Sequence, residues 1–237
     1  MPYAIMRFQK KKAGGVSACC NHNERLKQAY KSNPDIDPAK SHLNYRLVQP
    51  QCNYRRAVSQ LIAAAGCKTR RDSTVMVETL VTASPEFMGA LKPAVQREYF
   101  QRAFDFIKEK IGEENIIAAT VHMDEKTPHM HLSFCPITPD KRLSAKQILG
   151  NQAQLSRWQD DFHAAMSARW PQLERGLSSM ETGRKHIPLG LYKAEDKAAL
   201  ENRRLREKVR QQKWVIDRIP PEVLQDQKKQ KERTSVR

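Results

Sequence analysis

Three of the seven histidines lie in one short stretch of the chain, His122-Met-Asp-Glu-Lys-Thr-Pro-His129-Met-His131. Side chains alternate between the two faces of a β-strand, so His129 and His131 would point the same way. Turn-forming residues separate them from His122, and a hairpin would bring His122 opposite the pair. Three imidazoles that converge in this way form a metal site with open positions for water or substrate. The sequence therefore predicts that these three histidines bind a divalent metal.

Imidazole nitrogens suit Mn²⁺, Zn²⁺, Co²⁺ and Ni²⁺ better than Mg²⁺. We expect Mn²⁺, with Zn²⁺, Co²⁺, Ni²⁺ and Mg²⁺ as alternatives. Three neutral ligands leave the full charge on the ion, which makes it a strong Lewis acid toward a phosphate oxygen. Glu125, in the predicted turn, would serve as a general base or accept a hydrogen bond from a ligand N–H. Two plainer interpretations stay open: an ordinary turn carboxylate, and surface histidines that bind no metal.

The chain carries a net charge of +16, from 42 Lys and Arg against 26 Asp and Glu. Residues 1–75 hold 14 basic and 4 acidic side chains (+10), residues 76–192 hold 14 of each, and residues 193–237 hold 14 and 8 (+6). Two basic ends are typical of a protein that binds a polyanion, and we expect nucleic acid. Solvated surface charge is the alternative. The candidate contacts to the DNA backbone are Lys10, Lys11, Lys12, Lys68, Arg70, Arg71, Arg184 and Lys185.

Apolar periodicity and turn residues predict the elements that must position these side chains. Strands are expected over Tyr3–Gln9, His42–Val48 and Val75–Ala83, with a hairpin formed by Ile116–Met123 and His129–Cys135. Helices are expected within Ser17–Tyr30 (after a turn at Gly14-Gly15), over Tyr54–Ala65, over one long segment from Ser84 to Gly112, and over residues 152–169. The three tryptophans fall in helical stripes and are expected in the core.

The composition changes at Lys193, where a charged helix is predicted. An imperfect heptad pattern over residues 198–219 allows either a dimerising coiled coil or a helix that lies on the main domain. We expect a main domain over residues 1–192, a charged helix over 193–219 and a basic, disordered tail over 220–237. The longest apolar run, Leu61–Ala65, is far shorter than the roughly 18 residues of a membrane span. Five cysteines without a Cys-x-x-Cys pair favour the cytoplasm.

The pair His129-Met130-His131 resembles the motif of the HUH endonucleases, which nick single-stranded DNA at replication and transfer origins. The longer pattern His122-x-Asp-Glu-x-Thr-Pro-His-Met-His131-Leu-x-x-x-Pro is similar to the signature of the MobV relaxases, the Mob/Pre family of plasmid mobilisation and recombination. Three further segments agree with that family: residues 22–25 with 33–37, residues 41–45, and residues 173–176 with 184–186. Arg46 departs from the family, which usually has an aspartate there.

The resemblance implies an α/β (α+β) fold, in which an antiparallel HUH-type sheet is flanked by helices over residues 1–192. It implies His122, His129 and His131 as metal ligands, and His22 as nucleophile where most HUH enzymes use tyrosine. The implied activity is metal-dependent, site- and strand-specific nicking of single-stranded DNA beside a hairpin at a plasmid origin of transfer. A covalent 5′-phosphohistidine would form, and its reversal would rejoin the strand.

The same reading assigns supporting residues and partners. Arg25 is expected to clamp the scissile phosphate, Glu125 to act as base, and Tyr45 to contact DNA. Beyond DNA, the candidate partners are a second copy of the chain, if the heptad pattern of the C-terminal helix forms a coiled coil, and a coupling protein of the conjugation machinery. The expected location is the bacterial cytoplasm, without a membrane span.

Three side chains compete as the nucleophile: His22, Tyr45 and Tyr192. A phenol ionises near pH 10, whereas a neutral imidazole offers a lone pair near pH 7. We expect His22, placed at the start of a helix. Two other classes stay open: a replication initiator with a tyrosine nucleophile, and a non-enzymatic DNA-binding protein with a structural metal. A structural metal needs a fourth ligand, and no further Cys or His lies near the three histidines in sequence, so Asp124 or Glu125 would have to serve.

Overall fold

A computed structural model describes residues 2–27, 33, 35–176, 198, 201–202 and 204–213. The chain divides into two units, Met1–Thr182 and Gly183–Arg237. In the second unit residues 204–213 are helical, and the predicted seam residues Leu205 and Val209 are exposed. The boundary expected at residue 192 stays a prediction, and the tail over residues 220–237 lies outside the described residues. Among the described helices, none combines the length and the apolar character that a membrane span requires.

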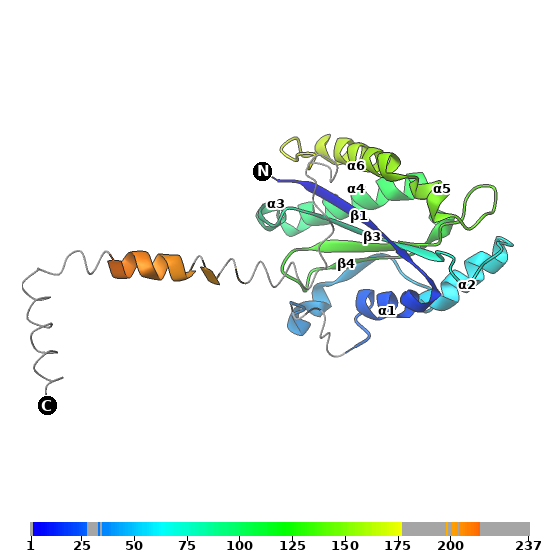
Figure 1. The fold of residues 1–237 in the computed structure, drawn as a ribbon, viewed down its shortest axis with the longest axis horizontal. Coiled ribbons are helices and arrows are strands. Elements are labelled where there is room, and N and C mark those ends of the chain that lie inside the picture. The colour runs from blue at the N-terminus through cyan, green and yellow to red at the C-terminus, as the bar shows by residue number, and fades with distance from the viewer. Residues whose placement is uncertain are drawn as a thin grey trace, which may run out of the picture. The chain divides into compact units, whose positions relative to one another are not determined.

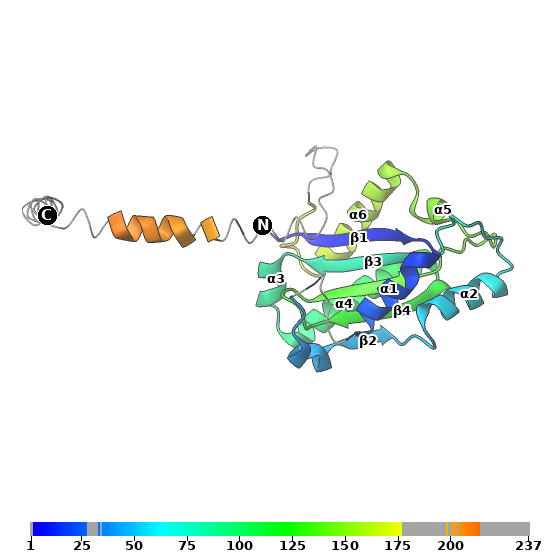
Figure 2. The same ribbon diagram turned by 60° about the horizontal axis from the view of Figure 1, so that its bottom comes forward.

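Five strands form one sheet in the spatial order β1-β3-β5-β4-β2, and all neighbouring strands are antiparallel. The strands are β1 (Ala4–Lys11), β2 (Tyr45–Val48), β3 (Met76–Ala83), β4 (Ile116–His122) and β5 (His129–Phe134). Figure 2 shows β1 and β2 at the two edges of the sheet. The expected antiparallel sheet and its β4–β5 hairpin are confirmed.

Helices cover both faces of this sheet. In Figure 1, α4 and α6 lie over one face, and α1 and α2 lie over the other. The helices are α1 (Ala13–Asn23), α2 (Tyr54–Ala64), α3 (Pro85–Ala90), α4 (Pro93–Ile111), α5 (Ala145–Leu149) and α6 (Gln152–Ser167), with short 3-10 helices η1 (Pro38–Leu43) and η2 (Glu113–Asn115). The expectation of a helix-flanked sheet is therefore confirmed.

Successive side chains of β5 point alternately into the apolar core and toward the candidate site. Met130, Leu132 and Phe134 are fully buried in the larger core, which also contains residues of α4 and α6. His129 and His131 alternate with them and point toward the opposite face, where α1 lies. The His131 ring lies 5.1 Å from the ring of His22 in α1, measured between centroids. One strand thus anchors the sheet with alternate residues and presents imidazoles with the others.

The helix α1 begins four residues before the segment in which it was predicted. It begins at Ala13, includes the two glycines expected to form a turn, and ends at Asn23. Each glycine costs roughly 1 kcal/mol relative to alanine in a helix. The buried residues Val16, Cys19, Cys20 and Asn23 recur at intervals of three and four, so one face of α1 packs against the sheet. Burial of that face offsets the glycine cost, which local propensity alone does not reveal.

The single long helix predicted from Ser84 to Gly112 is wrong: the chain forms α3 and α4, separated at Leu91 and Lys92. Pro93 is the first residue of α4, and a proline sterically disfavours helical geometry at the residue before it. Lys92 is accordingly extended, with ψ 151°. The short helix α5 was not predicted. Trp158 and Trp170 are buried, as expected, and the third tryptophan lies outside the described residues.

Candidate metal centre

The β4–β5 hairpin brings three imidazoles together. His122 and His129 are direct cross-strand partners, and His131 lies opposite Thr120, two residues further along the ladder. The ring centroid of His122 lies 5.2 Å from that of His129, and the His131 centroid lies 4.9 Å from each of the other two. The rigid pairing of two neighbouring strands therefore sets the geometry of the trio.

Two of these rings are oriented by backbone carbonyls. His122 Nε2 lies 2.9 Å from the carbonyl oxygen of Asn23, and His129 Nδ1 lies 2.9 Å from that of Thr127. A carbonyl oxygen only accepts, so each of these nitrogens carries the proton and the other nitrogen of the ring keeps its lone pair. His122 Nδ1 is such a nitrogen, and it is buried without a hydrogen-bond partner.

The third ring is oriented by Glu78 of β3, a residue that the sequence analysis missed. His131 Nδ1 lies 2.9 Å from Glu78 Oε1, and Lys11 Nζ lies 3.2 Å from the other carboxylate oxygen. His131 Nε2 is a second buried nitrogen without a hydrogen-bond partner. A lone acidic residue within an apolar strand was the available signal. Buried lone pairs backed by acceptors on the far side of the ring are what a metal requires, so the residues present fit a divalent cation.

Glu78 gives a direct prediction. Glu78→Ala removes the acceptor behind His131 and is expected to weaken Mn²⁺ binding about 10- to 100-fold, the usual cost of losing an outer-sphere partner. Glu78→Gln keeps an acceptor oxygen without the charge, so its affinity for Mn²⁺ should lie between those of the wild type and Glu78→Ala. Isothermal titration calorimetry with MnCl₂ measures the effect, with Glu86→Ala, an exposed acidic residue of α3, as the control. Unchanged affinity in Glu78→Ala would contradict this role.

A fourth imidazole, that of His22, approaches the trio from α1. His22 lies in the last turn of this helix and not at a helix start, which corrects the expectation from sequence. Its ring centroid lies 5.4 Å from that of His122 and 5.1 Å from that of His131. One ring nitrogen from each of the four histidines lies within 4.8 Å of the others. We call these residues (His22, His122, His129 and His131) the four-histidine cluster.

Burial favours the neutral form of His22, His122 and His129. Burial, His131 and Arg25 together lower the pKa of His22 to about 4. Burial and His131 lower the pKa of His129 to about 4, and the pKa of His122 lies lower still for the same reasons. The end of α1 would by itself favour a protonated imidazole at His22. Burial and the neighbouring positive groups outweigh that effect, so a lone pair is present at neutral pH.

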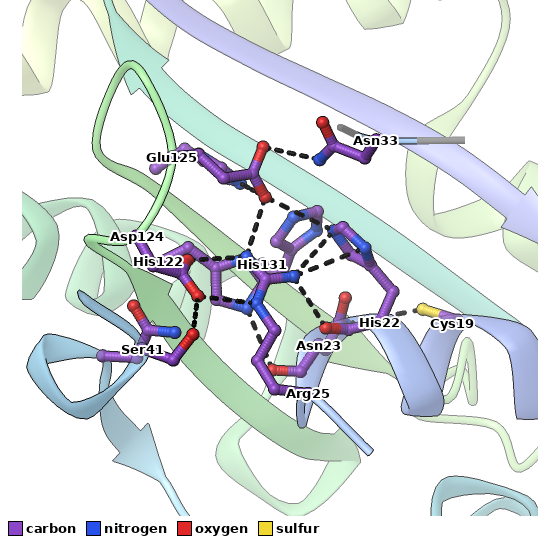
Figure 3. A network of polar contacts seen from close by, with 12 residues as sticks. Cys19, His22, Asn23, Arg25, Asn33, Ser41, His122, Asp124, Glu125 and His131 are labelled. Atoms are coloured by element: carbon purple, nitrogen blue, oxygen red, sulfur yellow. Dashed lines mark hydrogen bonds and ion pairs between the residues drawn. The ribbon is translucent and has the colours of Figure 1, made fainter. Parts of the chain in front are cut away.

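Arg25 links the end of α1 to the hairpin turn (Figure 3). Its Nε and Nη2 donate to the two carboxylate oxygens of Asp124 at 2.9 and 2.7 Å, and Nη2 also donates to Glu125 Oε1 at 2.8 Å. Its Nη1 donates to the carbonyl oxygen of His22 at 2.9 Å. Arg25 has a φ of 53°, a left-handed conformation that costs roughly 1–2 kcal/mol for a residue with a Cβ. These charge-assisted hydrogen bonds offset that cost.

Glu125 faces the centre of the cluster. Its Oε1 lies 3.7 Å from His129 Nε2, 3.8 Å from His122 Nδ1 and 3.9 Å from His22 Nε2. Its Oε2 accepts a hydrogen bond from Asn33 Nδ2 at 2.7 Å. Burial raises the pKa of Glu125, but His129, the Asn33 amide and Arg25 together lower it by more, so the net shift is downward. An ionised carboxylate therefore lies beside neutral imidazoles, an arrangement that attracts a cation.

Among the described tyrosines, Tyr45 is poorly placed for nucleophilic attack. The Tyr45 hydroxyl is buried without a hydrogen-bond partner, its ring lies 4.1 Å from the Arg97 guanidinium, and burial raises its pKa to about 12. Tyr54 and Tyr99, on the described helices, are fully buried and donate their hydroxyls to acceptors outside the cluster. Tyr192 lies outside the described residues.

Arg46, the departure from the family pattern, binds Glu24. Arg46 Nε lies 2.7 Å from Glu24 Oε2, and the other oxygen of Glu24 accepts from the hydroxyls of Tyr54 at 2.7 Å and Thr120 at 3.1 Å. Glu24 follows His22 by two residues. Arg46 therefore contributes to holding the segment that carries the His22 imidazole.

The candidate DNA contacts differ in whether their side chains already have partners. The Lys11 side chain already binds two partners: its Nζ lies 3.2 Å from Glu78 Oε2 and donates to Gln9 Oε1 at 2.7 Å. The Val75 amide donates to the Lys11 carbonyl, so the loop before β3 lies beside the end of β1. The described candidates that are exposed near this edge are Lys10, Lys12, Lys68, Arg70 and Arg71. Arg184 and Lys185 lie outside the described residues.

A five-stranded antiparallel sheet with a His-hydrophobic-His pair on its central strand, facing a helix, defines the HUH class of protein. The family model described as "plasmid recombination enzyme" (Mob_Pre) matches residues 1–194. This chain belongs to that family. The resemblance drawn from the sequence is thereby confirmed.

Several relatives are closely similar. Plasmid recombination enzyme type 3 of Mammaliicoccus lentus is 37% identical over 198 residues, which are 81% of this chain and 48% of the relative. The plasmid recombination enzyme of Bacillus thuringiensis is 37% identical over 201 residues, 84% of this chain and 44% of the relative. The chain thus spans about half the length of the curated relatives it matches.

Solved structures share the fold. The MobM relaxase domain (MOBV; Mob_Pre), Mn-bound and bound to plasmid pMV158 oriT DNA at pH 5.5, superposes with a TM-score of 0.74 at 31% identity. The match covers 81% of this chain and 99% of that domain. A further Mn-bound structure of that domain, at pH 4.6, gives a TM-score of 0.73.

Proposed function

We propose that this chain is the catalytic part of a plasmid mobilisation relaxase. The enzyme would make a site- and strand-specific nick in single-stranded DNA at an origin of transfer. The observation that carries the proposal is the position of His22, whose ring nitrogen lies within 4.8 Å of ligand nitrogens from three hairpin histidines. A nucleophile beside a potential Lewis-acid site is what phosphodiester cleavage needs. The fold shared with a DNA-bound relaxase domain supports the same proposal.

In this proposal His122, His129 and His131 hold a divalent metal, Mn²⁺ by preference, because the similar MobM domain is Mn-bound. When bound, the metal polarises the scissile phosphate and stabilises negative charge on its oxygens. The lone pair of His22 attacks phosphorus, a P–N bond forms, and the bond to the 3′-oxygen breaks. The 5′-phosphate stays on His22, so the 3′-hydroxyl can attack it later and rejoin the strand. Glu125 is the proposed acceptor for the proton that the imidazole loses.

The role of Arg25 differs from the phosphate clamp expected from the sequence. Its guanidinium is 12% exposed and already bonded to Asp124 and Glu125. A scissile phosphate would therefore have to share this guanidinium with two carboxylates. We propose that the main role of Arg25 is to hold His22 and the hairpin turn in place. It would contact the phosphate only through N–H groups that DNA binding frees from Asp124 and Glu125.

Nicking can be tested on supercoiled plasmid that carries the DNA flanking this coding sequence. Incubation with Mn²⁺ should convert it to open circles with one nick on one strand, and primer extension maps the site. Mass spectrometry then locates the DNA on the protein. A metal-dependent nick at scattered positions, or no nick, would contradict the proposal.

The exposed basic residues near β1 predict a steep salt dependence of DNA binding. Each phosphate contact contributes about 0.7–0.9 to the slope of log affinity against log salt. The triple variant Lys68→Gln, Arg70→Gln, Arg71→Gln should therefore lower the slope by up to about 2–3. Fluorescence anisotropy over a salt series measures it, with Lys92→Gln, an exposed lysine next to α4, as the control. An unchanged slope in the triple variant would show that these charges serve only solvation.

Further partners stay predictions. The candidates from sequence are a homodimer through residues 193–219 and a coupling protein of the conjugation machinery. We propose the bacterial cytoplasm as the place of action, which the five free cysteines support.

A further inference from the structure

The four-histidine cluster contains one imidazole more than an open catalytic site needs. His122 and His131 face the centre with buried, unpaired nitrogens, and His129 Nε2 lies beside them. His22 comes from a different element, yet one of its ring nitrogens is within 4.8 Å of the other ligand atoms. From the sequence, Asp124 or Glu125 would have to serve as the fourth ligand of a closed site, whereas the packing of α1 brings a fourth imidazole close to the other three.

The spacing of the four nitrogens suits a single ion. Nitrogens at about 2.0–2.1 Å from a tetrahedral Zn²⁺ lie roughly 3.4 Å from one another. The four nitrogens lie within 4.8 Å of one another, so they would have to approach by up to about 1.4 Å to bind one ion. His22 is well suited to move, because its side chain is 26% exposed, whereas that of His122 is fully buried.

We propose that His22 is a fourth metal ligand in the DNA-free protein and leaves the metal when a phosphate oxygen takes its position. This inference rests on the metal centre of the proposed function. While His22 is bound, its lone pair is shared with the metal and cannot attack phosphorus. The resting protein is thereby held inactive by its own nucleophile, and the incoming DNA releases that nucleophile beside the phosphate.

The exchange depends on the metal. Among the divalent ions of the series, Mn²⁺ binds nitrogen ligands most weakly, and Zn²⁺ binds them far more tightly. Zn²⁺ is also stable with four protein ligands and no open position, as in structural sites. Zn²⁺ should therefore retain His22 and occupy the protein in its resting form, whereas Mn²⁺ should release His22 readily. The same four residues would act as a closed site with one ion and as an open site with the other.

Co²⁺ absorption provides a test that does not depend on activity. The metal-free full chain is titrated with Co²⁺ alone, because tetrahedral Co²⁺ absorbs intensely in the visible range and six-coordinate Co²⁺ absorbs weakly. We expect intense bands for the wild type and shifted, weaker bands for His22→Ala and His22→Gln, because water is a weaker ligand than imidazole when it takes the fourth position. Added imidazole should restore the wild-type bands in His22→Ala. Competition with a chelator should show Zn²⁺ binding weakened by at least the roughly 10- to 100-fold cost of losing an outer-sphere partner. His42→Ala, an exposed histidine of η1, is the matched control.

The outcomes separate this inference from the metal centre itself. If both His22 variants match the wild type in spectrum and Zn²⁺ affinity while His129→Ala loses Co²⁺ binding, His22 is not a ligand and the three-histidine centre stands. If His129→Ala also binds Co²⁺ as the wild type does, the metal centre fails. Thermal melting checks that each variant is folded. If His22→Ala destabilises α1, His22→Gln still tests the loss of the imidazole.

Discussion

Replacing His131 with alanine is expected to abolish nicking and to leave most of the affinity for DNA intact. The substitution removes a ligand nitrogen and leaves the buried Glu78 carboxylate without the ring that it orients. Phosphate contacts elsewhere supply most of the binding energy, so affinity should change little. Nicking is measured as conversion of supercoiled to open-circular plasmid at saturating Mn²⁺, and binding is measured by anisotropy on the same preparations.

His129→Ala should behave in the same way, and His42→Ala should nick like the wild type. Thermal melts of each variant distinguish loss of metal from loss of folding. Equal loss of nicking and binding in His131→Ala would contradict the separation of these roles. Full nicking by His122→Ala would show that the hairpin is not the metal centre.

The second large effect is expected at His22, where the covalent DNA adduct should form. A phosphohistidine contains a P–N bond, which hydrolyses in acid and survives alkali, whereas the P–O bond of a phosphotyrosine survives mild acid. His22→Ala should lose the adduct and slow nicking by about 10⁴-fold or more, as when a covalent catalyst loses its nucleophile. Denaturing gels before and after acid treatment, followed by peptide mapping, measure both properties.

Tyr45→Phe is the informative comparison, because it keeps the ring against Arg97 and removes only the hydroxyl. This variant should still form the acid-labile adduct. An acid-stable adduct mapped to Tyr45 or Tyr192 would overturn the histidine mechanism and would leave the nicking activity in place.

The pH dependence follows from the same site. An ordinary imidazole would lose its lone pair below about pH 6.5. Burial, His131 and Arg25 lower the pKa of His22 to about 4, so its neutral form persists until the pH approaches that value. Single-turnover nicking with saturating Mn²⁺ should therefore continue well below pH 6.5 and fall only near pH 4. A midpoint near 6.5 would contradict this assignment.

Local patterns determined much of the fold. The alternation of β4 and β5 and the turn between them are encoded within about twenty residues, so the hairpin and the meeting of its three histidines could be predicted. The same holds for α2, where a capping Asn53 and Gly66 after the helix mark both ends. Predictions were wrong where local signals conflicted with burial or with proline geometry, at α1 and at the α3–α4 break.

By itself, the sequence determined the class of this protein: the His-Met-His pair, the hairpin that carries it and the family signature around it. The tertiary structure alone decided which distant residues complete the centre. His131 meets Glu78 across 53 positions, Arg25 meets Asp124 across 99, and His22 lies 100 residues before His122. No short-range period encodes such pairs, because they depend on how α1 and β3 pack beside the hairpin. Once those elements pack, they set both the orientation of the ligands and the position of the fourth imidazole.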